Sequence, residues 1–140
     1  MSTRSNIIIK NGKTNILLYR HCDGYLTGAG QDLLDDLRSS YFVYNDGYED
    51  KINFDIAKFT KKLLNQDGDY RIDDQLGGAI EYLYTLDFEN NYNDARHYNR
   101  VKLKSIEVNQ DVGFGHGGKR KFKTWFEFQD AINKERKENE

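Results

Sequence analysis

The chain has 140 residues, of which 37% are hydrophobic and 14% aromatic, and its formal net charge is −2. This length fits one domain with its own core, and the many aromatic residues exclude an intrinsically disordered chain. Cys22 is the only cysteine, which excludes an internal disulfide and is typical of a reducing compartment. No stretch resembles a signal-peptide core or the ~20 apolar residues of a membrane span, so we expect a cytoplasmic protein.

The charges are unevenly distributed along the chain. Residues 1–95 contain 10 basic and 16 acidic residues, whereas residues 96–123 contain 8 basic and 2 acidic residues. A basic segment of this kind offers a binding surface for an anionic partner. It can equally neutralise the acidic part of the chain within the fold, and the sequence leaves both interpretations open.

The first 20 residues predict a β-hairpin. Residues 6–10 are rich in isoleucine and form the first expected strand, and residues 14–20 form the return strand. Asn11-Gly12 lies between them, and this pair favours a type I′ turn.

Two helices are predicted next. Apolar residues recur at helical spacing over residues 33–41, which predicts a helix that ends near Tyr44. A second helix is predicted over residues 53–65, with Asn53 as its N-cap.

The following part of the chain predicts two more strands. Residues 66–78 are polar and predict a loop, after which residues 79–88 are rich in tyrosine and leucine and predict a third strand. Residues 89–98 predict a turn or a longer excursion. The fourth strand is expected over residues 98–108, where the alternation of side chains slips at Ser105 and indicates a β-bulge.

A last helix is predicted to begin after Thr124, which forms a capping box with Glu127, and to fray over residues 134–140. The expected order along the chain is therefore ββααββα. This order predicts a single α+β domain over residues 1–140, with helices packed on one face of an antiparallel sheet.

Residues 19–25 concentrate more chemistry than any other part of the chain, because they place a guanidinium, an imidazole, a thiol and a carboxylate around one turn. One interpretation is structural. Asp23 would then cap backbone N–H groups and pair with Arg20 or His21, while Gly24 adopts a positive φ.

Ligand contact and catalysis are the other two interpretations of this turn. Arg20, His21, Asp23 and Tyr25 would then line or brace a functional surface. Strand alternation places Cys22 and His21 on opposite sides, which disfavours a Cys–His nucleophile pair. Two neighbouring ligands do not make a metal site, so we expect neither a metal nor a cofactor.

A second candidate site is the glycine-rich segment 113–118, which contains His116 and is followed by Lys119, Arg120 and Lys121. Backbone N–H groups of such a loop can surround a phosphate, with the cations adding charge. The segment matches neither a P-loop nor a dinucleotide-binding fingerprint. The alternative is a mobile loop that joins the last strand to the last helix.

The basic segment 96–123 also contains Tyr98, Phe114 and Phe122, and rings interleaved with cations suit single-stranded nucleic acid. No named nucleic-acid motif is present. Alternatively, the acidic first half could mimic nucleic acid and occupy a basic groove of another protein.

The opening Ser2-Thr3-Arg4-Ser5 and the turn Tyr19-Arg20-His21-Cys22-Asp23-Gly24-Tyr25 resemble those of a group of small phage and prophage proteins. In that group Trp often replaces Cys22, and Pro often stands where this chain has Leu26. The resemblance covers about the first 35 residues. The group has no settled activity, so the resemblance implies a phage-encoded accessory protein that acts in the bacterial cytoplasm.

Accessory phage proteins often act against host defence. We therefore expect a non-enzymatic binding protein that inhibits an anti-phage defence system, by binding a defence protein or by sequestering a nucleotide signal. One alternative is a nucleic-acid-binding module that uses residues 96–123. Another is a small enzyme acting on a phosphorylated nucleotide, with His21 or His116 as the acid–base group.

Overall fold

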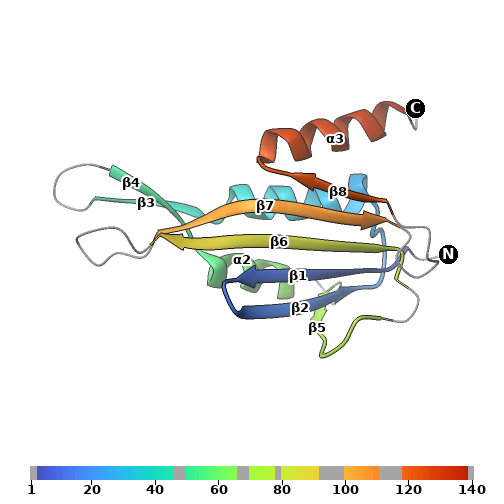
Figure 1. Ribbon diagram of the computed structural model, residues 1–140, viewed down its shortest axis with the longest axis horizontal. Coiled ribbons are helices and arrows are strands. Elements are labelled where there is room, and N and C mark those ends of the chain that lie inside the picture. Colours follow the sequence, from blue (N-terminus) through green and yellow to red (C-terminus); the bar gives the residue numbers. More distant parts are fainter. Residues whose placement is uncertain are drawn as a thin grey trace.

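The computed structural model of the protein describes residues 3–45, 50–65, 70–77, 80–91, 100–110 and 118–138 (Figure 1). The elements in chain order are β1 (Ser5–Asn11), β2 (Thr14–Arg20), the one-turn π-helix η1 (Leu26–Gly30), α1 (Gln31–Arg38), β3 (Tyr41–Asn45), β4 (Asp50–Phe54), α2 (Ile56–Leu64), β5 (Tyr70–Ile72), β6 (Tyr82–Asn91), β7 (Arg100–Gln110), β8 (Lys119–Phe122) and α3 (Trp125–Glu138). The chain is thus a mixed α+β protein, as predicted.

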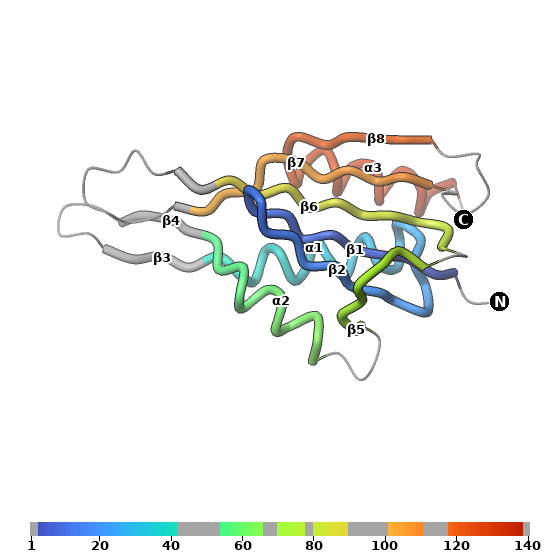
Figure 2. Tube along the Cα trace, turned by 60° about the horizontal axis from the view of Figure 1, so that its bottom comes forward, coloured from blue at the N-terminus to red at the C-terminus, as the bar shows by residue number. Residues whose placement is uncertain are grey.

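Six strands form one sheet in the order β5-β2-β1-β6-β7-β8, and β3 and β4 form a separate two-stranded ribbon. The prediction of a purely antiparallel sheet with the order ββααββα is wrong, because β1 and β6 pair in parallel. The hairpin leaves one edge of β1 free, and β6 reaches that edge through a long connection that contains helices, as parallel pairing requires. Figures 1 and 2 show the three α-helices on one face of this sheet.

The core lies between the sheet and these helices. Period-two alternation turns one side of each strand inward, so that Ile7 stands beside Tyr84 and Ile9 beside Leu86 in the β1–β6 register. The helices cover this layer with the following buried residues: Leu33, Leu34 and Leu37 of α1, Phe59 and Leu63 of α2, and Phe128 and Ile132 of α3. Burial of each such side chain contributes about 1.5–3 kcal/mol relative to its exposure.

The β1–β2 hairpin is confirmed, with Asn11 paired to Thr14. Its two-residue loop is Gly12-Lys13 rather than Asn11-Gly12. Gly12, the first loop residue, has a φ of +61°. Lys13, the second, does not have a positive φ, because Asp23 is the only non-glycine residue with positive φ in the described part of the chain. Positive φ at the first loop position alone matches a type II′ turn and corrects the predicted type I′ turn.

The first helix is shorter than predicted. It ends at Arg38, and the hydroxyl of Ser40 donates to the carbonyl of Asp36 at 2.7 Å, beyond the last turn. Tyr41 then begins β3 and pairs with Phe54 of β4. The run from Tyr41 to Tyr44 is aromatic and β-branched, a composition that favours a strand over continuation of the helix.

The second helix begins at Ile56, so the prediction of Asn53 as its N-cap is wrong. Asp55 is the N-cap, and its carboxylate accepts a hydrogen bond from the backbone N–H of Lys58 at 3.0 Å. Asn53 belongs to β4. Both residues are good caps by type, and strand pairing with β3 decides between them.

Besides β3 and β4, two further short strands were not predicted. Tyr70–Ile72 forms the edge strand β5 within the expected loop 66–78, of which residues 66–69 and 78 lie outside the described residues. Lys119–Phe122 forms the opposite edge strand β8 and pairs with β7. Strands of only three or four residues carry almost no periodic signal.

The bulge predicted at Ser105 is confirmed to within one residue. Ser105 pairs with Asp87 and Leu103 pairs with Phe88, so Lys104 is the extra residue.

Thr124 is the N-cap of the last helix, as predicted, but the reciprocal hydrogen bond of the capping box comes from the N–H of Lys123 and not from that of Thr124. The hydroxyl of Thr124 accepts a hydrogen bond from the N–H of Glu127, and the carboxylate of Glu127 accepts one from the N–H of Lys123 at 2.8 Å. The helix continues to Glu138, beyond residue 134, where fraying was predicted to begin. None of the described helices combines the length and hydrophobicity that crossing a membrane requires.

Candidate functional site

Arg20 is the centre of the polar turn and is 6% exposed. Its Nε donates to the carbonyl of Cys22 at 2.7 Å, and its Nη1 donates to Asp32 at 2.7 Å and to the hydroxyl of Tyr70 at 2.8 Å. Burial lowers the pKa of Arg20, but Tyr70 and Asp32 more than offset this effect, so the guanidinium stays charged. Arg20 therefore joins β2 to α1 and β5, and little of its side chain is exposed.

The turn after Arg20 is held by its backbone. Asp23 has a φ of +54°, which its short polar side chain tolerates. Its carbonyl accepts a hydrogen bond from the N–H of Ala29 at 2.7 Å, which ties η1 to the turn. Gly24 does not have a positive φ, so that prediction is wrong. Gly24 is needed because an added Cβ would lie 2.9 Å from both Thr3 and Ser5.

The predicted pairing of Asp23 with Arg20 or His21 is not found. Asp23 accepts from the hydroxyl of Tyr25 at 3.0 Å, and this hydrogen bond raises the pKa of Tyr25. The imidazole of His21 shares a 2.9 Å hydrogen bond with the hydroxyl of Tyr19 instead. Because β2 ends at Arg20, the strand alternation used to orient residues 21–23 does not apply to them. His21, Asp23 and Tyr25 are exposed, so three of the four predicted residues remain accessible at this turn.

Because of the Arg20 network, the free energy of unfolding is expected to fall as the pH rises in the alkaline range. Burial raises the pKa of Tyr70 to about 12, and Arg20 opposes the shift. A phenol with a raised pKa stabilises the fold fully below pH ~10, and this contribution is lost as the pH rises towards 12. We expect Tyr70 to account for a loss of about 2 kcal/mol between pH 10 and pH 12. Urea unfolding across this window should show a shallower decline for Tyr70→Phe, and an equal decline would contradict the assignment.

The second predicted cluster is divided between two faces. Lys119 and Lys121 lie opposite Asn109 and Glu107, on the face that carries no α-helix in the described residues, whereas Arg120 turns towards α3 and lines a cavity with Glu135. Burial raises the pKa of Glu135, and Arg120 opposes this shift.

This cluster is also remote from the polar turn. Strand β8 is four positions from β2 in the sheet, which is about 19 Å at ~4.8 Å per strand. The two predicted clusters therefore do not form one site. His116 and the loop 113–117 lie outside the described residues.

The open face of the sheet, meaning the face opposite the helices, has a mixed surface. Its centre carries the partly buried Ile8, Leu17 and Leu83. At one end Gly77 donates to the side chain of Asn6 at 2.9 Å, so the connection after β5 covers that corner. The end near the β1–β2 turn is uncovered by the described residues.

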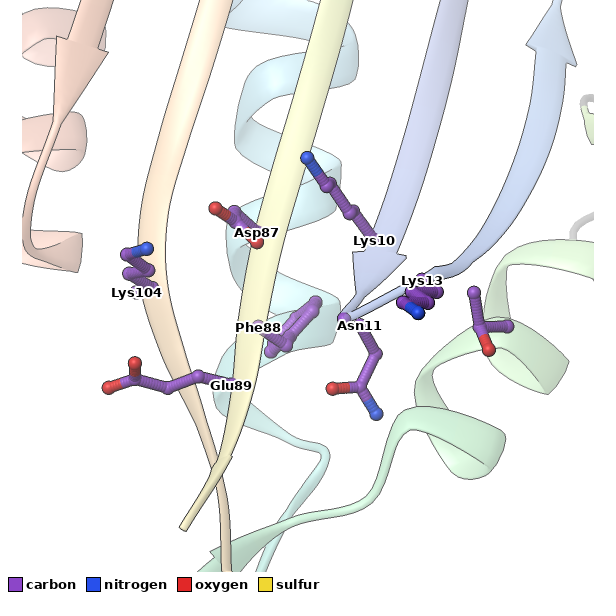
Figure 3. A pocket seen from close by; sticks show the side chains of 9 residues that line it. Lys10, Asn11, Lys13, Asp87, Phe88, Glu89 and Lys104 are labelled. Atoms are coloured by element: carbon purple, nitrogen blue, oxygen red, sulfur yellow. The ribbon is translucent and has the colours of Figure 1, made fainter.

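A polar cleft of about 580 Å³ lies at this uncovered end (Figure 3). We call it the lysine cleft, because Lys10 of β1, Lys13 of the turn and Lys104 of the bulge line it together with Asp87 and Glu89 of β6. All three lysines are exposed. They come from three separate structural elements and line one cavity, which is the strongest sign of a recognition surface on the open face.

The charge balance of the open face favours an anion. Lys102 pairs with Glu89 at 3.2 Å, and Lys119 pairs with Glu107 at 3.5 Å, so these two carboxylates are neutralised from neighbouring strands. Asp87 lies opposite Lys10 in the β1–β6 register. The lysine cleft therefore keeps an excess of positive charge.

Sequence reasoning missed Lys10 and Lys13. The hairpin signal places both near one turn, but only the parallel β1–β6 pairing brings them beside Lys104.

Within the described residues, no group of three or more His, Cys, Asp or Glu side chains could hold a metal ion. Comparison of the chain with protein families, with curated proteins and with solved structures finds no match.

Proposed function

We propose that the chain is a non-enzymatic binding protein that recognises an anionic partner on the open face of the sheet, with the lysine cleft at the centre of the contact. The observation that carries this proposal is that Lys10, Lys13 and Lys104 line one open cavity. The resemblance of the first 35 residues to small phage proteins makes a bacterial defence protein or its nucleotide signal the partner that we favour.

A compact anion suits this surface better than a long polyanion does. The lysine cleft supplies three cations within one cavity, whereas Asp87, Glu89 and Glu107 interrupt any continuous basic path across the sheet. A nucleotide phosphate or a cluster of acidic side chains needs only the short span of the cleft, where Asp87 lies opposite Lys10 and Glu89 pairs with Lys102. A nucleic-acid strand running towards Lys119 and Lys121 would pass directly over Glu107.

The proposal predicts binding of inorganic triphosphate, used as the probe, that depends on the lysine cleft. Titration calorimetry at low salt should show affinity about tenfold weaker for the double variant Lys10→Gln/Lys104→Gln, because two exposed charge contacts are lost. Affinity should also fall with added salt, since the Debye length is only ~10 Å at 0.1 M. Lys137→Gln, an exposed cation on α3, is the matched control and should bind like the natural protein.

Equal affinity of the double variant and the natural protein would contradict a role for the lysine cleft. The nucleic-acid alternative makes a different prediction. A 12-nucleotide single strand would then bind far more tightly than triphosphate, with a salt slope of about −0.7 per neutralised phosphate, and Lys119→Gln/Lys121→Gln would weaken it most. This outcome would move the interface to β8.

A further inference from the structure

A second cavity lies on the other side of the β1–β2 hairpin, between its tip and α2. Its volume is about 650 Å³, and its walls come from β1, β2 and one side of α2. We call it the α2 cleft. Its apolar lining residues are Ile9, Ile16, Ile56, Ala57 and Leu64. It shares Asn11 and Thr14 with the lysine cleft but is otherwise separate from it.

Ile9 belongs to the core, but most of the aliphatic side chains that line the α2 cleft are not fully buried. Helix α2 packs on α1 and β5, and its Phe59 and Leu63 are fully buried. Ile56 and Leu64 of the same helix, and Ile16 of β2, are only partly buried. Apolar surface gathered in a concave site is typical of ligand binding, and cavities of ~300–1,000 Å³ with few polar groups are the usual form.

Among the polar groups that line the α2 cleft, Lys61 is the only charged one. Thr60, Lys61 and Asn65 of α2 line it together with Asn11 and Thr14 of the hairpin, and no acidic residue is among the lining residues. Lys61 is exposed and pairs with no carboxylate in the described part of the chain. An apolar cavity with a cation at its edge complements a molecule that has a hydrocarbon chain and an anionic head.

We infer that the α2 cleft binds a free single-chain carboxylate amphiphile of medium length, with its chain against Ile16, Ile56 and Leu64 and its head group at Lys61. Its volume of about 650 Å³ accommodates a flexible hydrocarbon chain. The inference does not depend on the lysine cleft, so either site can fail without the other.

Titration with octanoate, decanoate and dodecanoate, each below its micelle-forming concentration, tests whether the α2 cleft binds the hydrocarbon chain. Affinity should rise about fourfold for every two methylene groups, because each methylene leaves roughly half of its surface exposed in an open cleft. Ala57→Trp places a large ring in the cleft from an exposed helix position and should weaken decanoate binding at least tenfold, with an unchanged circular dichroism spectrum.

The head group is tested by comparing decanoate with decanol. The natural protein should prefer the carboxylate by about threefold, as a single exposed charge contact allows. This preference should vanish in Lys61→Gln and persist in Lys58→Gln, which changes an exposed lysine of the same helix outside the cleft.

Three results would overturn the inference: no saturable decanoate binding, equal binding by Ala57→Trp, or a carboxylate preference that survives Lys61→Gln. Binding to vesicles of anionic phospholipid without binding of the free acid would also overturn it, because the ligand would then be a membrane surface.

Discussion

Replacing Arg20 with methionine is expected to lower the free energy of unfolding by about 3 kcal/mol. Methionine keeps much of the apolar stem but removes every donor. The carbonyl of Cys22 and the buried hydroxyl of Tyr70 then lose their partner, and Asp32 loses its cation. The side chain of Asp32 is 45% exposed, so water can solvate it again and limit the cost of that loss.

Urea unfolding at pH 7, followed by circular dichroism, measures this change. Arg20→Lys should fall between the two proteins, because a lysine keeps the charge but not the planar fork that reaches three acceptors. Arg71→Met is the matched control. Arg71 is exposed and lies over the ring of Tyr19 at 4.5 Å, a contact worth roughly 0.5–1 kcal/mol at an exposed site. A loss below 1 kcal/mol for Arg20→Met would show that the network is dispensable.

The Arg20 network also shows where sequence reasoning reaches its limit. The turn was predicted to be either an architectural element or a site, and the contacts of Arg20 support the architectural role for that residue. Its partners were nevertheless assigned wrongly. Asp23 is near in sequence, whereas Asp32 and Tyr70 are 12 and 50 residues away, and Tyr70 lies on a three-residue strand that has no periodic signal of its own.

The fold divides in the same way between local and distant interactions. The hairpin, the bulge near Ser105 and the cap at Thr124 were predictable, because each depends on residues within a few positions of one another. The parallel pairing of β1 with β6 was not, since contacts between residues such as Ile7 and Tyr84 leave no local pattern. The lysine cleft depends on that pairing, so Lys10 and Lys13 could not be predicted as site residues from the sequence.

Tyr41 illustrates competition between two signals. It continues the helical spacing of the leucines in α1, yet it also opens a run of aromatic and β-branched residues. Its ring stacks on Trp125 at 4.6 Å and packs edge-on against Phe54 at 5.0 Å. These contacts come from α3 and β4, so tertiary packing decided a choice that the sequence left balanced.

Gly28→Ala is expected to destabilise the fold by about 3 kcal/mol or more, because the position has no room for a Cβ. A Cβ at Gly28 would lie 2.3 Å from the carbonyl oxygen of Asp23. That oxygen already accepts the hydrogen bond from Ala29 at 2.7 Å, and Asp23 is the residue with φ of +54°. Neither the backbone nor the turn can shift without breaking this hydrogen bond.

Gly30→Ala is the matched control, two residues further along η1. A Cβ there meets only side-chain atoms of Leu26 and Phe128, each at 3.4 Å, and the helical backbone favours alanine by up to ~1 kcal/mol. Its stability in urea should therefore stay within about 1 kcal/mol of the natural protein. Equal unfolding midpoints for both variants would mean that the turn at Asp23 accommodates the added Cβ at little cost in stability. The opposite result, a loss confined to Gly28→Ala, would make the turn a rigid base for His21, Asp23 and Tyr25, and would justify testing those exposed side chains as a third contact surface.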